Sequence, residues 1–172
     1  MISDKFYLNQ QNKIKSSKAF GFFWAMWAIY SSLLFVAIAF YFFAIGSWKI
    51  IAAGFLAALF ARYVICEAIA VFKKKMHPYQ RLNFQPPTSW LFSFSDSRPD
   101  AFPSQHTAFF AACLPAIWHL NSSLGLAALL IVIMISWARI VVGYHDFVDV
   151  AAGWVLGLLW GFLTLYLGAR FW

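Results

Sequence analysis

Charged residues are scarce in this chain. Asp, Glu, Lys and Arg make up only 11% of its 172 residues, against roughly 25% in an ordinary soluble domain. Because 63% of the residues are hydrophobic, a soluble domain of this length could not bury so much apolar surface. Acidic residues are the scarcest, with six against 13 basic ones and a formal net charge of +7. This excess suggests nucleic acid or an anionic lipid surface as partner. The hydropathy favours lipid, and we expect no nucleic-acid partner.

Cysteine is also rare. Cys66 and Cys113 both lie inside apolar runs, where a cysteine usually serves as a small buried hydrophobe. We therefore expect neither a disulfide framework nor a thiolate metal site. The length suits one domain, and we expect residues 1–172 to form a single membrane-embedded unit.

Long apolar runs are the main positive feature. A helix needs about 20 mostly apolar residues to cross a bilayer. Five runs approach this requirement, at about residues 20–45, 50–72, 105–120, 124–142 and 147–167. The first is too long for a signal-peptide core and has no cleavage site, so we expect it to be retained. The sequence predicts an all-α integral membrane helical bundle with about five transmembrane helices.

Residues 1–19 carry four lysines among scattered apolar residues. This pattern is typical of an amphipathic interfacial segment, although a solvated tail is the alternative. With five spans, this segment, the loop 73–104 and the turn 143–146 lie on one side of the membrane. Most of the cationic residues lie on or near that side, and charge bias alone would make it cytoplasmic.

Glycine recurs every fourth residue in the last run, at Gly153, Gly157 and Gly161. Such a stripe allows two helices to approach closely. We expect packing inside the bundle, with dimerisation as the alternative.

Three polar clusters lie on the loop-rich side. They are Lys73-Lys74-Lys75 with Arg81, then Pro103-Ser104-Gln105-His106, and finally Arg139 with His145 and Asp149. In the second cluster, Pro103 suits the first turn of a helix. Ser104 and the free amides of that turn would form an anion site beside His106, although a histidine there is often only interfacial.

In the third cluster, His145 and Asp149 are four residues apart and so share one helix face. The carboxylate can hold one imidazole N–H, which leaves the other nitrogen to attack phosphorus or carry a proton. A surface pair that caps the last helix is the alternative. Arg139 returns the chain to the same membrane face, and the converging cations suit a phosphate ester.

Metal ligation is not expected at these clusters. The histidines have no His-x-x-His spacing and no second carboxylate beside them. The other carboxylates on this side, Asp96, Asp100 and Asp146, are isolated in the sequence. We therefore expect no metal and no cofactor.

The three clusters resemble the type 2 phosphatidic acid phosphatase superfamily, whose motifs are K-x6-R-P, P-S-G-H and S-R-x5-H-x3-D. Lys74 and Arg81 have the spacing of the first motif. Residues 103–106 fill the second, and Arg139, His145 and Asp149 match the third. Three positions depart from the pattern: Leu82 replaces proline, Gln105 replaces glycine and Ala138 replaces serine. With three adjacent lysines, Lys73 or Lys75 could take the place of Lys74.

The resemblance implies a division of labour among these residues. His145 would be the nucleophile that forms a phosphohistidine, Asp149 would orient it, and His106 would protonate the leaving group. The remaining residues would bind phosphate: Lys74, Arg81, Ser104, the amide of Gln105, and Arg139. Residues 1–172 would then be one phosphatase domain, with 73–104 as its active-site loop.

The short chain is most similar to the small bacterial undecaprenyl diphosphate phosphatases of this superfamily. The resemblance implies a bacterial inner-membrane protein with its site on the periplasmic or extracellular face, and we follow it over the charge bias. A phosphatidate or phosphatidylglycerophosphate phosphatase is the alternative within the superfamily. A transporter or scaffold that binds anionic lipid is the non-enzymatic alternative. The oligomeric state stays open.

Two ionisable residues lie inside the second apolar run. Arg62 and Glu67 either form an ion pair within the bundle or serve function, which is the usual reason for charge at membrane depth. Glu67 precedes Lys74 by seven residues, so it would lie on nearly the same helix face, below the expected site.

Overall fold

The computed structural model of the chain describes residues 4–30, 33, 37, 38, 40, 41, 44, 45, 48–86 and 100–168. Within these residues the regular structure is helical and contains no strand, which confirms the predicted all-α class. The elements are α1 (Asp4–Ser16), α2 (Lys18–Ala25), the π-helix η1 (Met26–Tyr30), α4 (Trp48–Phe60), the π-helix η2 (Ala61–Ile65), α5 (Cys66–Phe72), α6 (Pro78–Arg81), α7 (Gln105–Leu120), α8 (Ser122–Val141) and α9 (Phe147–Gly168).

Three helices among the described residues are long and apolar enough to cross a membrane: Trp48–Phe72, Ser122–Val141 and Phe147–Gly168. The first is continuous through α4, η2 and α5. α7 has 16 residues, fewer than the about 20 that a span requires. The expected span at 20–45 lies largely outside the described residues beyond Tyr30. Membrane-spanning helices are therefore supported, and the count of about five stays a prediction.

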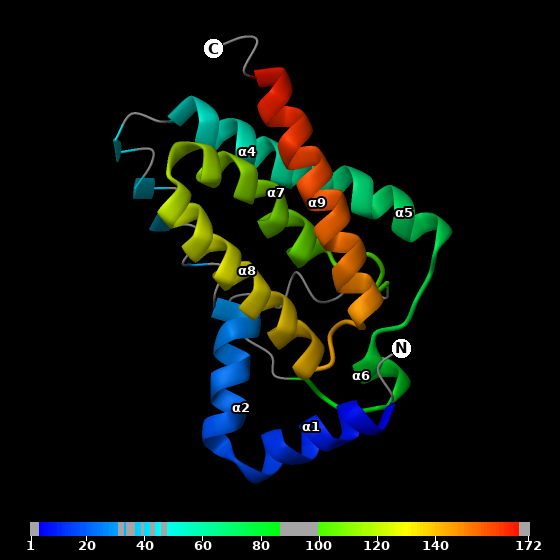
Figure 1. Cartoon of the computed structure of the whole chain (residues 1–172). Helices are drawn as coiled ribbons and strands as arrows, with labels where there is room; N and C mark the ends of the chain where they lie inside the picture. Colours follow the sequence, from blue (N-terminus) through cyan, green and yellow to red (C-terminus); the bar gives the residue numbers. More distant parts are fainter. Residues whose placement is uncertain are drawn as a thin grey trace.

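α7 is the central helix of the bundle and packs against α4, α8 and α9 (Figure 1). Its contact with the α4–α5 segment consists mainly of small residues, which let two helix backbones approach closely. These residues are Ala57, Ala58, Ala61, Cys66, Ala108 and Ala112. Cys66 is fully buried there, as expected for a cysteine in an apolar run.

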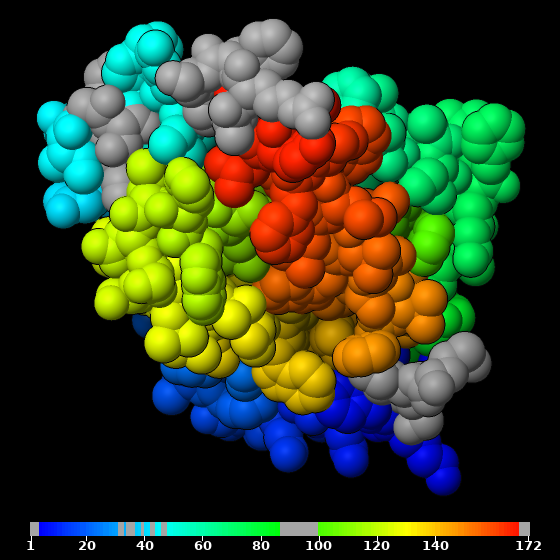
Figure 2. All heavy atoms as spheres, turned by 45° about the horizontal axis from the view of Figure 1, so that its top comes forward, coloured from blue at the N-terminus to red at the C-terminus, as the bar shows by residue number. Residues whose placement is uncertain are grey.

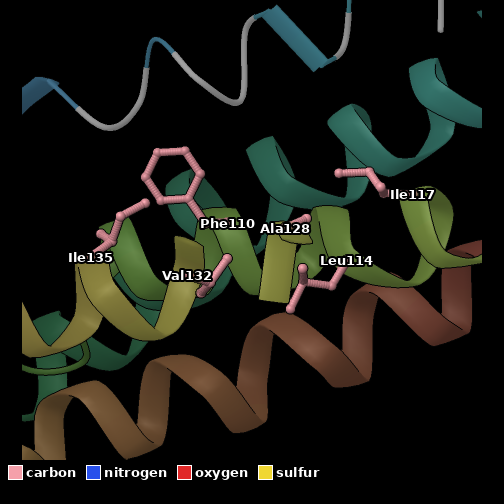
Figure 3. Close-up of a cluster of buried hydrophobic side chains, with 6 residues drawn as sticks. All are labelled: Phe110, Leu114, Ile117, Ala128, Val132 and Ile135. Atoms are coloured by element: carbon pink, nitrogen blue, oxygen red, sulfur yellow. The ribbon is translucent and has the colours of Figure 1, made fainter. Parts of the chain in front are cut away.

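Larger apolar side chains join α7 to α8 (Figure 3). The cluster consists of Phe110, Leu114, Ile117, Ala128, Val132 and Ile135. On each helix these residues recur at intervals of three or four, so they form one apolar stripe facing the partner helix. Asn121 joins the two helices, and its side chain caps α8 by accepting a hydrogen bond from the Leu124 amide. The short link holds α7 and α8 antiparallel.

The glycine stripe of α9 packs against α7. A β-carbon at Gly153 would lie 2.6 Å from the Ser104 carbonyl oxygen, and one at Gly161 would lie 2.5 Å from the Ala112 carbonyl oxygen. Side-chain carbons do not approach other atoms so closely, so only glycine permits this contact between two backbones. The prediction that the stripe packs inside the bundle is confirmed.

We expect Gly157→Leu to destabilise the protein by about 2 kcal/mol, because overpacking a close helix contact costs about 1–3 kcal/mol. A β-carbon at this position would lie 2.8 Å from that of Ala111, so α7 and α9 must separate. Thermal unfolding in detergent measures the effect. Leu159→Phe is the control, because Leu159 lies on the same helix and is 62% exposed. Equal unfolding temperatures for the two variants would contradict the described contact.

One end of the bundle gathers the predicted polar clusters. α7 begins there, α8 ends there, and α9 begins after the turn 142–146. α1 lies across this end (Figure 1), where Tyr7 packs against Ile140 and Val150. Tyr7 is completely buried. The amino-terminal segment is therefore a packed helix from Asp4 onward and not a solvated tail.

Candidate active site

The turn between α8 and α9 holds Arg139 and His145 together. Gly143 has a φ of +85°, in the left-handed region that favours glycine. The backbone amides of Tyr144 and His145 donate hydrogen bonds to the Arg139 carbonyl oxygen at 2.9 and 3.3 Å. The short turn thus returns His145 to the end of the helix that carries Arg139.

The His145 ring is oriented by a backbone carbonyl. Its Nδ1 lies 2.9 Å from the carbonyl oxygen of Ala101. A carbonyl only accepts hydrogen bonds, so Nδ1 is the donor and Nε2 of the neutral ring keeps its lone pair. The sequence predicts Asp149 for this role, but the nearest Asp149 oxygen is 4.0 Å from Nδ1. The orienting hydrogen bond therefore comes from Ala101, and Asp149 is an electrostatic neighbour.

Asp149 has other partners. Its carboxylate is fully buried, and Oδ1 accepts a hydrogen bond from Lys75 Nζ at 2.6 Å. Its Oδ2 accepts the backbone amide of Asp146 at 2.8 Å. These two bonds turn the carboxylate away from the imidazole, which is the physical reason for the difference from the sequence prediction.

The three lysines after α5 have different surroundings. The chain leaves the helix at Lys73 with φ −126° and ψ 78°, so helical spacing does not apply to them. Lys73 Nζ lies 4.2 Å from the centre of the Phe102 ring, and Lys75 reaches Asp149. Lys74 is exposed and makes no ion pair with any described residue. The structure therefore brings Lys75 into the site, in place of the Lys74 that motif spacing indicates.

Asp146 is a central member of the site, although it is isolated in the sequence. Its Oδ2 lies 2.9 Å from Lys75 Nζ and 3.6 Å from an Arg81 nitrogen. Arg81 also pairs with Asp4 at 2.7 Å. The sequence signal that could have identified Asp146 is its position between His145 and Asp149. Although Asp146 looks isolated in the sequence, in the structure Asp146 and Asp149 both pair with Lys75.

The electrostatics of the site suit a neutral His145 among charged neighbours. Burial lowers the pKa of His145 well below its ordinary value, and the positive charge of Arg139 and the proximity of His77 add to this shift. Burial opposes the ionisation of Lys75 and of Asp146. The hydrogen bonds between them overcome that penalty, so the pKa of Lys75 is raised and that of Asp146 is lowered. Both groups are charged at neutral pH.

The predicted anion-binding segment opens α7. Ser104 is fully buried, its amide donates to the Asp149 carbonyl oxygen at 2.9 Å, and its hydroxyl lies 3.0 Å from that of Thr107. The Ser104 side chain does not cap the helix. The amide of Ser104 is therefore used to join α7 to α9, and the helical amides that follow it point toward the same end of the bundle.

Gln105 and His106 occupy the first turn of α7. The side-chain nitrogen of Gln105 donates to a Glu67 carboxylate oxygen at 2.6 Å. The residue that replaces the motif glycine is therefore hydrogen-bonded to Glu67, the ionisable residue predicted to lie below the site. His106 is half-buried. The charged and titratable groups whose electrostatic effects reach it are Arg139, Arg62 and His145.

Arg139 is 3% exposed. Its guanidinium lies over the Tyr144 ring at 4.1 Å, and one terminal nitrogen donates to the Ala28 carbonyl oxygen at 3.5 Å. Stacking on an aromatic ring fixes the plane of a guanidinium. Arg139 is thus a buried cation near the end of α8, and the α8–α9 turn connects it to His145.

Sequence reasoning missed two further residues of the site. His77 is 6% exposed. Its Nδ1 bonds to the Tyr144 carbonyl oxygen, and its ring meets that of His145 with centres 5.4 Å apart. Tyr7 donates its hydroxyl to Asp146 at 2.8 Å. In the sequence, His77 lies between Lys74 and Arg81 of the first motif, and this position could have identified it as a site residue. Tyr7 offers no signal, because 139 residues separate it from its partner.

Metal-ligating groups are not clustered in the described part of the chain. Within these residues, no group of three or more His, Cys, Asp or Glu side chains is arranged to hold a metal ion. The charges around His145 that could hold an anion are those of Lys75, Arg81 and Arg139. The arrangement suits binding of a phosphate group by cationic side chains.

Comparison with known families assigns the class of protein. A model of the PAP2 superfamily matches residues 51–172. This match covers more than half of the chain and includes all three polar clusters, so the chain belongs to the PAP2 superfamily. Members are phosphatases, which supports a phosphatase that acts on phosphorylated lipids. Comparisons with curated proteins and with solved structures give no match.

Proposed function

We propose that this protein is a metal-independent lipid phosphatase that converts undecaprenyl diphosphate to undecaprenyl phosphate through a phosphohistidine. The observation that supports the proposal most directly is the hydrogen bond between His145 Nδ1 and the Ala101 carbonyl oxygen at 2.9 Å. This bond leaves the lone pair of Nε2 for attack on phosphorus, and the low pKa of His145 keeps the ring neutral at physiological pH.

The proposed reaction has two steps, transfer of the phosphoryl group to His145 and its hydrolysis. Nε2 of His145 forms a bond to the terminal phosphorus as the bond to the bridging oxygen breaks. His106, which the bound phosphate anion keeps protonated against burial and the opposing charges of Arg139 and Arg62, gives its proton to that oxygen. The lipid product leaves and phosphohistidine remains. Neutral His106 then takes a proton from water, whose oxygen attacks phosphorus and releases inorganic phosphate and free His145.

The cationic residues stabilise the transferring phosphoryl group. Its equatorial oxygens carry the charge in the transition state, and preorganised cations there lower the barrier. The cations proposed for this role are Lys75, Arg81 and Arg139. Ser104 and the backbone amide of Gln105 are proposed to bind the phosphate as neutral groups. Asp149 has a positioning role, since it holds Lys75 at 2.6 Å, and its Oδ2 lies 4.0 Å from His145 Nδ1.

The choice of substrate and location rests on the resemblance to small bacterial undecaprenyl diphosphate phosphatases. The proposed location is a bacterial inner membrane, with the site on the periplasmic or extracellular face. The proposed partners are the lipid phosphate substrate and the surrounding membrane lipids. Three apolar helices that could cross a membrane support a lipid substrate, because its tail and the protein then share the bilayer.

The test is phosphate release by the purified protein in detergent with a chelator present. Undecaprenyl diphosphate, phosphatidate and phosphatidylglycerophosphate are compared as substrates. We expect the diphosphate to have the highest kcat/KM and the rate to be insensitive to chelator. A preference for a glycerolipid would move the function to phospholipid synthesis. A requirement for divalent metal would contradict the metal-independent reaction, and no release from any substrate would favour a lipid-binding scaffold.

A further inference from the structure

One face of α1 reaches into the candidate site. Asp4, Tyr7 and Gln11 are three and four residues apart, so they lie on the same side of the helix. Asp4 pairs with Arg81 at 2.7 Å, and the Gln11 side-chain nitrogen donates to the Val142 carbonyl oxygen at 3.3 Å. Between these two anchors, the Tyr7 hydroxyl donates to Asp146 Oδ1 at 2.8 Å. In Figure 2 the amino-terminal helices follow the lower edge of the molecule, beside the end of α8.

We propose that Tyr7 is a positioning residue for phosphate transfer, which acts by holding Asp146 in the orientation that keeps Lys75 in the site. The inference rests on the proposed function and adds a residue outside the three motifs. The family match begins at residue 51, so α1 lies outside it.

The geometry around Asp146 gives Tyr7 a specific task. Lys75 Nζ bridges the two carboxylates, at 2.9 Å from Asp146 and 2.6 Å from Asp149. Asp146 uses Oδ2 for the lysine and Oδ1 for Tyr7. The tyrosine therefore fixes the rotation of the carboxylate whose other oxygen binds the lysine.

The charged and titratable groups that face Asp146 come from five elements. They are Tyr7 from α1, Lys75 from the segment after α5, Arg81 from α6, Asp149 from α9 and the adjacent His145 in the turn. Burial opposes the ionised carboxylate, whereas the hydrogen bonds from Lys75 and Tyr7 and the positive charge of Arg81 favour it. Removing the Tyr7 hydroxyl removes one donor, so the pKa of Asp146 must rise and the carboxylate is protonated at a higher pH.

The first experiment is the pH profile of kcat/KM for Tyr7→Phe. We expect the acid limb to move upward by about one pH unit, because a hydrogen bond to an ionised group is worth at least about that much. Activity at the alkaline plateau should fall severalfold, because the freed Asp146 carboxylate holds Lys75 less firmly at every pH. A purely structural role would lower activity without moving the acid limb. Tyr63→Phe is the matched control, since it removes the same hydroxyl from a 50% exposed side chain.

A second readout does not depend on phosphatase activity. The carboxyl carbon of Asp146 is titrated by ¹³C NMR, with Asp146→Asn used to assign its signal. We expect Tyr7→Phe to raise the midpoint by about one pH unit, even if the protein releases no phosphate and the proposed function fails. An unchanged midpoint, or an unchanged acid limb in an active enzyme, would overturn the role of Tyr7. The same follows if Tyr7→Phe changes the acid limb equally in an Asp146→Asn background.

Discussion

Replacement of His145 by alanine is expected to lower phosphate release at least about a thousandfold, since the proposed nucleophile is lost while the fold is retained. The buried side chain accounts for one hydrogen bond to Ala101, and His145 lies in a turn and not within a helix. The melting temperature in detergent should fall only modestly, because the loss of one buried hydrogen bond costs about 1–3 kcal/mol. Release of inorganic phosphate from undecaprenyl diphosphate measures the effect.

The matched control for this experiment is His119→Ala. His119 is exposed at the opposite end of α7, so its removal should leave activity within about twofold. Labelling with ³²P-substrate gives a second readout, because the wild type should carry acid-labile phosphate and the His145 variant should carry none. His106→Ala should slow both formation and breakdown of this intermediate. Full activity in the His145 variant would refute the assigned nucleophile.

Lys75→Met is expected to lower kcat/KM about a hundredfold or more, the scale of losing one preorganised charge that stabilises the transition state. Methionine keeps the apolar length of the side chain but leaves Asp146 and Asp149 facing each other without the cation between them. Their repulsion should also reduce the melting temperature. Phosphate release and thermal unfolding of the same samples measure the two effects.

Lys74→Met tests whether Lys75, as the structure indicates, or Lys74, as the motif spacing indicates, binds phosphate. Lys74 is exposed, so its removal should change kcat/KM by less than about threefold, whereas Lys75→Arg should retain part of the activity because it keeps the charge. If Lys74→Met is the more damaging substitution, the motif spacing and not the orientation seen here identifies the phosphate ligand. Equal, small effects of Lys74→Met and Lys75→Met would show that neither lysine takes part in the reaction.

The sequence predicts those features that depend on short spacings. The helical class follows from the apolar runs, and the four-residue glycine period of the last run correctly predicts its packing within the bundle. The third motif, a compact turn, puts Arg139 near His145 by local geometry alone. Each of these conclusions needs only distances of a few residues along one helix or turn.

Other features depend on tertiary contacts or on the end of a helix. Which lysine enters the site depends on where α5 ends, at Phe72, and on how the chain leaves the helix. The partner of His145 Nδ1 is a backbone carbonyl, which has no signature in a side-chain pattern. Asp146 and Tyr7 meet across 139 residues. No periodicity could have connected them.

Gly153 lies four residues beyond Asp149 and directly against the start of α7. A β-carbon there would lie 2.6 Å from the Ser104 carbonyl oxygen, and the Ser104 amide already bonds to the Asp149 carbonyl oxygen at 2.9 Å. The two segments that carry His106 and His145 are thus spaced by contact between main chains. The hydrogen atom that glycine carries in place of a side chain lets the two segments that hold the proposed proton donor and the proposed nucleophile lie in main-chain contact, and any larger residue at position 153 would push them apart.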